Sequence, residues 1–274
     1  MTNRKTRLLS LLLASVMTLA LLSGCSKDTG SSSGNSGKGK DSLVVATMSE
    51  TPSMGPYDHN AVAGDYMNQL VYSSLFETDA DLNPVPELVD TYENTSDTEW
   101  LFHLKQGVKF HDGSDLTSED VVASITYAKT CPEINLYNGS ILSVEAVDDY
   151  TVKMTTDGPS ATLLYDLCHH GNSIVPKELL DSGNDFNENP IGSGPYKFVS
   201  WKRGDSLTFE AFEDYFKGPA KIKNMTWKII PEGSSRTIAL EAGEIDFIIE
   251  VEAMDADRLK ENSDLKVISF EHTS

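Results

Sequence analysis

The sequence has few basic residues, and this scarcity already restricts its partners. Lys and Arg number 22 against 42 Asp and Glu in 274 residues, which gives a formal net charge of −20. A surface this acidic repels phosphate backbones, so we expect no nucleic-acid partner. Solubility alone also accounts for the acidity, and the charge predicts nothing about the fold.

Motifs of catalytic and cofactor sites are absent as well. The sequence contains no Gly-x-Ser-x-Gly nucleophile elbow, no phosphate-cradling glycine-rich loop and no His-Glu-x-x-His zinc helix. Gly192 and Gly194 are followed by Pro195, which blocks the helix start that a dinucleotide fingerprint needs. We therefore expect a protein that is not an enzyme and that carries no cofactor.

One long apolar run is present, near the start of the chain. Basic residues precede the run 8–22, LLSLLLASVMTLALL, which is shorter than the roughly 18 to 20 residues of a membrane-spanning helix. Small residues and then Cys25 follow it. This order resembles the lipobox of bacterial lipoproteins, which implies a signal peptide over 1–24 and lipidation of Cys25. An ordinary secretory signal is the alternative.

The segment after Cys25 is typical of a tether. Residues 26–40, SKDTGSSSGNSGKGK, contain no apolar side chain and predict a flexible linker, so that 25–40 comprises the lipidated cysteine and this linker. The two acyl chains of a lipoprotein are enough for stable anchoring. The predicted location is the cell membrane, lipid-anchored on its extracellular face, or on the periplasmic side in a Gram-negative cell.

From residue 43 onward, short strand patterns alternate with helical ones, which predicts a mixed α/β fold. Thr117 precedes acidic residues and predicts a helix N-cap. A strand, a helix ended by Gly243 and a second strand predict a βαβ unit with parallel strands. Strands are expected at 43–47, 100–105, 151–156, 196–201, 206–212, 225–230 and 245–249, and helices within 57–76, from 117 onward and at 234–242.

Five segments, in order, carry a family resemblance. They are 86–93 (PELVDTYE), 99–121 (EWLFHLKQGVKFHDGSDLTSEDV), 189–196 (NPIGSGPY), 214–218 (DYFKG) and 240–246 (LEAGEID). Together they resemble the family 5 extracellular solute-binding proteins, the peptide and nickel receptors of ABC importers. Ser193 stands where the family usually has Thr. These motifs consist mainly of turn, cap and core residues, so they indicate the framework and not the ligand.

The resemblance implies a periplasmic-binding-protein-like (type II) α/β fold. One lobe would have a mixed sheet and comprise 41–85 plus 190–274, and an inserted α+β subdomain would comprise 86–189. Because family members are about twice as long, we expect the second lobe to be missing from this chain.

The function that the resemblance implies is capture of oligopeptides or dipeptides by a monomeric, membrane-anchored receptor. Lobe closure then delivers the peptide to an ABC permease in the membrane. Two alternatives stay open. One is a receptor for a nickel chelate or another small solute, and the other is a truncated surface lipoprotein without a role in transport.

The ligand is expected at the carboxyl ends of the strands, where open α/β sheets bind their ligands. The loop after 43–47 offers backbone groups for pairing with an extended peptide and two adaptable methionines, although an ordinary surface loop is the alternative. A weaker candidate follows the helix that begins at Thr117. The candidate ligand-binding residues are Met48, Ser49, Glu50, Thr51, Met54, Tyr137 and Asn138.

Two cysteines remain besides Cys25, and they suggest a cross-link. An oxidising environment favours a disulfide between Cys131 and Cys168, with two free thiols as the alternative. Cys168, His169 and His170 are consecutive, and three adjacent side chains cannot all converge on one ion in regular structure. We therefore expect no metal site.

Overall fold

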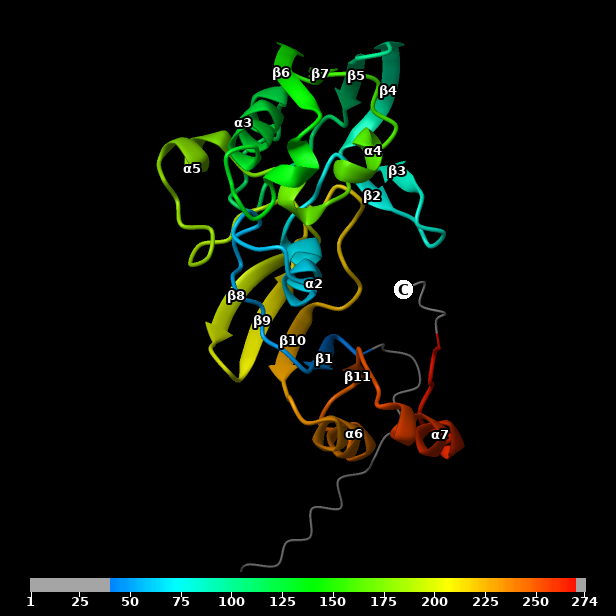
Figure 1. Cartoon of the computed structure of the whole chain (residues 1–274). Helices are drawn as coiled ribbons and strands as arrows, with labels where there is room; N and C mark the ends of the chain where they lie inside the picture. Colours follow the sequence, from blue (N-terminus) through cyan, green and yellow to red (C-terminus); the bar gives the residue numbers. More distant parts are fainter. Residues whose placement is uncertain (1–39, 270–274) are drawn as a thin grey trace, which may run out of the picture. The chain divides into compact units, whose positions relative to one another are not determined.

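Strand β1 (Ser42–Thr47) lies inside a five-stranded mixed sheet with the order β11-β1-β10-β9-β8 (Figure 1). The computed structural model describes residues 40–269, so the expected signal peptide, Cys25 and linker residues up to 39 lie outside the described part. The other strands of the sheet are β8 (Tyr196–Lys202), β9 (Ser206–Ala211), β10 (Asn224–Ile229) and β11 (Phe247–Ile248).

The predicted βαβ unit is present, with one difference in strand order. Strand β10, helix α6 (Gly233–Glu241) and strand β11 follow one another, and both strands run parallel to β1. However, β1 lies between them, because β1 pairs with β10 through Val45 and Trp227 and with β11 through Val45 and Phe247. Strands β9 and β8 extend the sheet in antiparallel fashion, which makes it mixed, as predicted.

A second, antiparallel sheet is formed by the middle of the chain. Its order is β4-β5-β7-β6, with β4 (Val89–Ser96), β5 (Glu99–Leu104), β6 (Ile141–Asp148) and β7 (Thr151–Thr156). Helix α3 (Ser118–Ala128) contacts this sheet and begins with a capping box, in which Thr117 and Asp120 each bond to the backbone of the other. The predicted N-cap at Thr117 is therefore confirmed.

Helix α2 (Val62–Val71) lies between the two sheets (Figure 1) and contacts both β8 and η2 (His170–Asn172). The end of α2 approaches the 192–196 turn closely: a Cβ on Gly194 would lie 2.6 Å from the carbonyl carbon of Val71. Glycine is therefore required at this crossing, because any side chain would collide with the helix backbone.

Short elements connect these parts. They are β2 (Phe76–Thr78), β3 (Pro84–Pro86), η1 (Asn135–Asn138), α4 (Leu163–Asp166), α5 (Lys177–Asp181) and α7 (Ala253–Glu261). Each sheet has its own hydrophobic core, with Phe102 and Phe110 in one and Phe209 and Trp227 in the other. Within residues 40–269, no helix combines the length and apolarity that crossing a membrane requires.

Candidate ligand site

A cavity of about 100 Å³ lies at the carboxyl ends of β1 and β11. Parallel strands end at the same edge of a sheet, so the residues that follow them meet there. Helix α2 begins beside this edge and closes the cavity from the other side. The lining residues are Thr47, Met48, Ser49, Val62, Ala63, Tyr66, Ile249 and Glu250.

Tyr66 forms the aromatic wall of the cavity. Its ring stacks on Trp227 of β10, with centroids 5.9 Å apart and an interplanar angle of 24°. Partial burial, with a smaller contribution from the negative charge of Glu250, raises the pKa of the Tyr66 hydroxyl. The ring is thus held against the sheet, and its hydroxyl stays a neutral donor and acceptor at neutral pH.

Glu250 is the only carboxylate that lines the cavity. It is exposed, and no ion pair involves it among residues 40–269. Exposed apolar side chains line the same cavity, since Met48 and Val62 are 50% and 66% exposed. An apolar rim with one available carboxylate suits a ligand that carries both an apolar group and a cation.

The predicted loop 48–54 divides into a part that lines the cavity and a part that does not. Met48 and Ser49 line it. Glu50 instead accepts hydrogen bonds from the Trp201 indole N–H at 2.6 Å and from the Gly204 amide at 2.9 Å. This carboxylate therefore holds the β8–β9 hairpin against the loop.

The remaining two residues of that loop also have internal roles, in contrast to the expectation. Met54 is completely buried in the core, and its carbonyl oxygen accepts a hydrogen bond from Tyr72. Thr51 is 3% exposed, and its hydroxyl donates to the Ser53 carbonyl. The permissive pocket wall expected from two methionines is thus reduced to Met48, because Met54 faces the protein interior.

Tyr137 and Asn138 do not line this cavity. The Tyr137 ring stacks on His169 with centroids 3.5 Å apart, and its hydroxyl accepts a hydrogen bond from the Asn60 side chain at 3.2 Å. Asn138 is 1% exposed, and its side-chain atoms have no hydrogen-bond partner among the described residues. The structure therefore places the two groups of predicted residues apart.

Sequence reasoning did not select Tyr66, Ile249 or Glu250. The sequence did point to two of them, because the expected strand at 245–249 ends at Ile249, directly before Glu250. Open α/β sheets bind ligands at the carboxyl ends of their parallel strands, and this strand is one of them. Tyr66 lies within the expected helical segment. Its position over the end of β1 depends on the packing of α2, which periodicity does not reveal.

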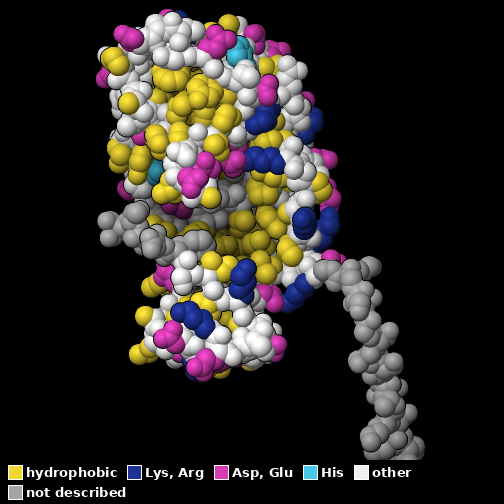
Figure 2. Space-filling view, turned by 90° about the vertical axis from the view of Figure 1, so that its right-hand side faces the viewer, with side chains coloured by type: hydrophobic (Ala, Val, Ile, Leu, Met, Phe, Trp, Pro, Cys, Tyr) yellow, Lys and Arg dark blue, Asp and Glu magenta, His cyan; other side chains and the backbone are white. Residues whose placement is uncertain are grey.

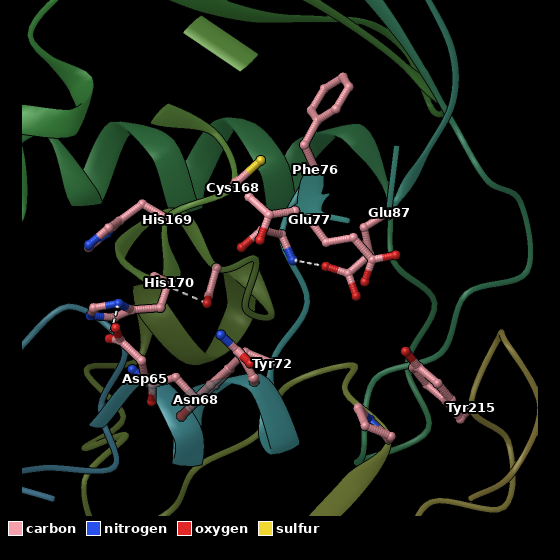
Figure 3. Close-up of a pocket in the computed structure, with 15 residues that line it drawn as sticks. Asp65, Asn68, Tyr72, Phe76, Glu77, Glu87, Cys168, His169, His170 and Tyr215 are labelled. Carbon is pink, nitrogen blue, oxygen red and sulfur yellow. Dashed lines mark hydrogen bonds and ion pairs between the residues drawn. The ribbon is translucent and has the colours of Figure 1, made fainter. Parts of the chain in front are cut away.

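A larger pocket of about 380 Å³ lies between α2 and the segments that precede and follow the antiparallel sheet (Figure 3). Asp65, Asn68 and Tyr72 of this helix line one side, and Glu87 and His170 line others. Its ionisable groups lie in pairs: His170 with Asp65 at 2.6 Å and Glu87 with Lys217 at 3.2 Å. Burial nevertheless raises the pKa of Glu87.

The cysteines differ from the expected cross-link. Cys131 and Cys168 are both free thiols, and they pack against different hydrophobic cores. Each thiol donates to the carbonyl of the residue four positions earlier, Tyr127 and Leu164 respectively. Burial raises the pKa of the Cys168 thiol to about 11. Among residues 40–269 no cluster of side chains suited to a metal ion occurs.

Hydrophobic side chains also collect in a hollow on one face of the described residues, bordered by acidic and basic side chains (Figure 2). Two exposed apolar residues, Met48 and Val62, line the cavity at the ends of β1 and β11. An apolar surface of this kind, rimmed by charge, is typical of a binding face.

Comparison with known proteins identifies the family. The sequence model of the bacterial extracellular solute-binding proteins, family 5 (middle), matches residues 83–274. The chain belongs to this family, and its fold is the periplasmic-binding-protein-like fold.

Individual relatives give the same result. The chain is 31% identical to the glutathione-binding protein GsiB of Pectobacterium atrosepticum, over 82% of this chain and 45% of the relative. It is 33% identical to the oligopeptide-binding protein AppA of Bacillus subtilis, over 98% of this chain and 52% of AppA. The chain thus spans about half the length of the curated relatives it matches.

Solved structures of the family superpose on this fold. The structure of AppA from Bacillus subtilis with a nonapeptide has a TM-score of 0.76 at 29% identity, over 83% of this chain and 47% of AppA. NikZ from Campylobacter jejuni in complex with Ni(L-His) has a TM-score of 0.72 at 29% identity, over 82% of this chain and 46% of NikZ. The same framework therefore occurs with different ligands, so membership of the family does not identify the ligand of this chain.

Proposed function

We propose that this protein is the substrate-binding lipoprotein of an ABC importer, and that it captures oligopeptides or dipeptides by lobe closure. The observation that carries the proposal is the cavity at the ends of β1 and β11, with an apolar rim, an aromatic wall and one available carboxylate. The similarity to peptide-binding relatives supports it. Binding involves no covalent chemistry.

The residues suggest how a peptide is recognised. The backbone after β1 pairs with the extended peptide in the manner of an added strand, and Met48 and Tyr66 contact an apolar peptide side chain. Glu250 attracts the ammonium group of the peptide or a basic side chain. This division of roles follows the usual pattern in which apolar walls supply contact area and a few polar groups fix orientation.

The proposal includes an organisation of the chain and a location. Residues 41–85 and 190–274 form the lobe that carries the cavity, and 86–189 form the inserted subdomain. The second lobe closes over the cavity. Lipidation of Cys25 and the linker up to residue 40 attach the receptor to the membrane beside its permease. The receptor acts as a monomer.

Thermal unfolding with defined ligands tests this function. A ligand that binds only the folded protein at 100 times its Kd stabilises it by about 2.7 kcal/mol, so di- to pentapeptides should raise the Tm. Tyr66→Ala should abolish the shift, whereas Leu142→Ala, on an exposed position of β6, should keep it. A shift with nickel and histidine but with no peptide would instead support a nickel-chelate receptor.

A further inference from the structure

Four aromatic rings from three separate segments form a continuous stack beside α2. The ring of His59 lies 5.1 Å from that of His170, His170 lies 4.2 Å from His169, and His169 lies 3.5 Å from Tyr137, all between ring centroids. Three of the four rings are imidazoles. The stack therefore places three groups that accept protons within contact distance of one another.

The central ring, His170, has a polar neighbour at each nitrogen. Its Nδ1 lies 2.6 Å from a carboxylate oxygen of Asp65, shown by the dashed line in Figure 3, and its Nε2 lies 3.1 Å from the carbonyl oxygen of His59. The carbonyl oxygen only accepts, so Nε2 donates to it, and the Asp65 carboxylate is the nearest counter-charge to the ring.

The outer two imidazoles are neutral, because each uses a ring nitrogen as an acceptor. The Nδ1 of His59 accepts from the Ala61 amide at 3.3 Å, and the Nδ1 of His169 accepts from the Gly171 amide at 3.0 Å. The Nε2 of His169 lies 3.2 Å from the side-chain oxygen of Asn60, to which it donates. A proton on either Nδ1 would remove a backbone hydrogen bond.

The charges around the stack leave little compensation for a proton on His59 or His169. Asp65 from α2 already pairs with His170, and Asp58, in the loop before the helix, accepts a hydrogen bond from the Ser53 hydroxyl at 2.7 Å. Tyr137 is the titratable side chain that η1 contributes. Burial and then the electrostatic interaction with His170 lower the pKa of His59 and of His169, the latter to about 4.

The stack joins α2 to η2, and α2 also lines the ligand cavity. Ala61 is the N-cap residue of this helix, and its amide donates to the His59 ring. Gly64 packs directly on the His59 ring, since a Cβ there would lie 1.9 Å from Cε1. Asp65 lies on α2 next to Tyr66, the aromatic wall of the cavity.

We propose that this histidine stack is a proton-sensitive latch that positions α2. While His59 and His169 are neutral, the latch holds the helix and therefore sets the cavity. A proton that enters at His59 or His169 places a positive charge within the stack, breaks the backbone hydrogen bond to that ring and releases the helix. The three histidines and Asp65 are positioning residues for Tyr66. This inference does not depend on the identity of the ligand.

Hydrogen exchange at different pH values tests the latch without any ligand. After correction for the intrinsic exchange rate, amides of α2 should lose about tenfold in protection between pH 7 and pH 4.5, the equivalent of one pKa unit of coupling. Strands β5 and β7 should keep theirs and thereby exclude global unfolding. The double variant His59→Asn/His169→Asn retains acceptors near the Nδ1 positions but cannot titrate, so its α2 protection should no longer depend on pH.

The matched control is His103→Gln, which removes a partly exposed histidine of the antiparallel sheet and should behave as wild type. If the double variant folds poorly, an NMR titration of the histidines in the wild-type protein tests the proposal instead. His59 and His169 should then stay neutral well below pH 6.5, and α2 protection should fall progressively as the pH decreases from about 6.5. Titration of both near 6.5, or α2 protection that does not change over this range, overturns the proposal.

Discussion

The Nε2 of His111 donates a hydrogen bond to the carbonyl oxygen of Gly194 at 3.0 Å, and the His111 amide donates to Gly192 at 2.8 Å. The His-Asp-Gly turn and the Gly-Ser-Gly-Pro-Tyr turn, two segments that carry the family resemblance, are therefore bonded to each other. The His111 ring is buried, with Phe212 against it at 4.9 Å between centroids. Burial, and to a lesser degree the nearby Lys197, lowers the pKa of His111 to about 4.

The first prediction is that stability falls as the pH decreases from about 6.5 to about 4. The folded protein keeps His111 neutral in that range, whereas the unfolded chain binds a proton with a pKa of about 6.5, so protons favour the unfolded state. The full effect of this one group is about 3 kcal/mol. Urea unfolding at several pH values measures it.

His111→Gln separates this contribution from that of the histidine stack. The variant should be less stable at pH 7 and should show a flatter pH dependence between pH 4 and 6.5, with a residual slope from His59 and His169. An unchanged slope would contradict the assignment to His111.

The second prediction concerns the glycine at the crossing with α2. Gly194→Ala should destabilise the protein by about 1 to 3 kcal/mol, because the added Cβ overlaps the backbone of Leu70, Val71 and Tyr72. Gly158→Ala is the matched control, since a Cβ there meets no atom within 4 Å. Chemical denaturation of the two variants should differ clearly, and equal midpoints would show that the turn can move away from the helix.

The third prediction concerns the contact between Asp65 and His170. Asp65→Asn should destabilise the protein by about 1 to 3 kcal/mol, because it removes the carboxylate that lies 2.6 Å from the buried His170 ring. Asp97→Asn, on an exposed turn, should change the free energy of unfolding by less than about 0.5 kcal/mol. Urea unfolding of the two variants measures the difference, and equal midpoints would argue against a stabilising contact between Asp65 and His170.

The fourth prediction concerns the thiols. Dithiothreitol should leave the Tm unchanged, because Cys131 and Cys168 are not bonded to each other. A disulfide between them would contribute about 3 to 4 kcal/mol, and its reduction would lower the Tm by several degrees. Mass spectrometry under non-reducing conditions gives a direct check: a peptide pair linked through these two cysteines would contradict the structure.

Local patterns predicted much of the fold. The buried-type run beginning at Leu43 forms β1, the cap at Thr117 begins α3, and Gly243 follows α6 with the positive φ of 71° that a helix end requires. Strand β4 escaped detection, because nearly all of its residues are exposed and the alternation of apolar and polar side chains is lost. The position of β1 between β10 and β11 depends on pairing across almost the whole described chain.

The candidate site was less predictable for the same reason. The loop after β1 was found by a rule about strand ends, and Met48 and Ser49 lie where that rule puts them. Glu50 and Met54, in the same loop, look equally suitable in the sequence. In the structure, however, Glu50 accepts a hydrogen bond from Trp201 of β8, and Met54 packs in the hydrophobic core. Sequence reasoning dismissed His169 and His170 as metal ligands and gave them no other role. Their stacking depends on contacts with loops more than thirty residues away, so no local pattern indicates it.

The register of β1 determines the order in which the protein can fold. Ser42 pairs with Asn224 and Ala46 with Ile248, so β1 has no partner until most of the chain has been synthesised. Strands β4 to β7 pair with close neighbours in sequence, and their loops close at lower entropic cost. Among the described residues we therefore expect folding to start in the middle of the chain and to end when β1 inserts between β10 and β11.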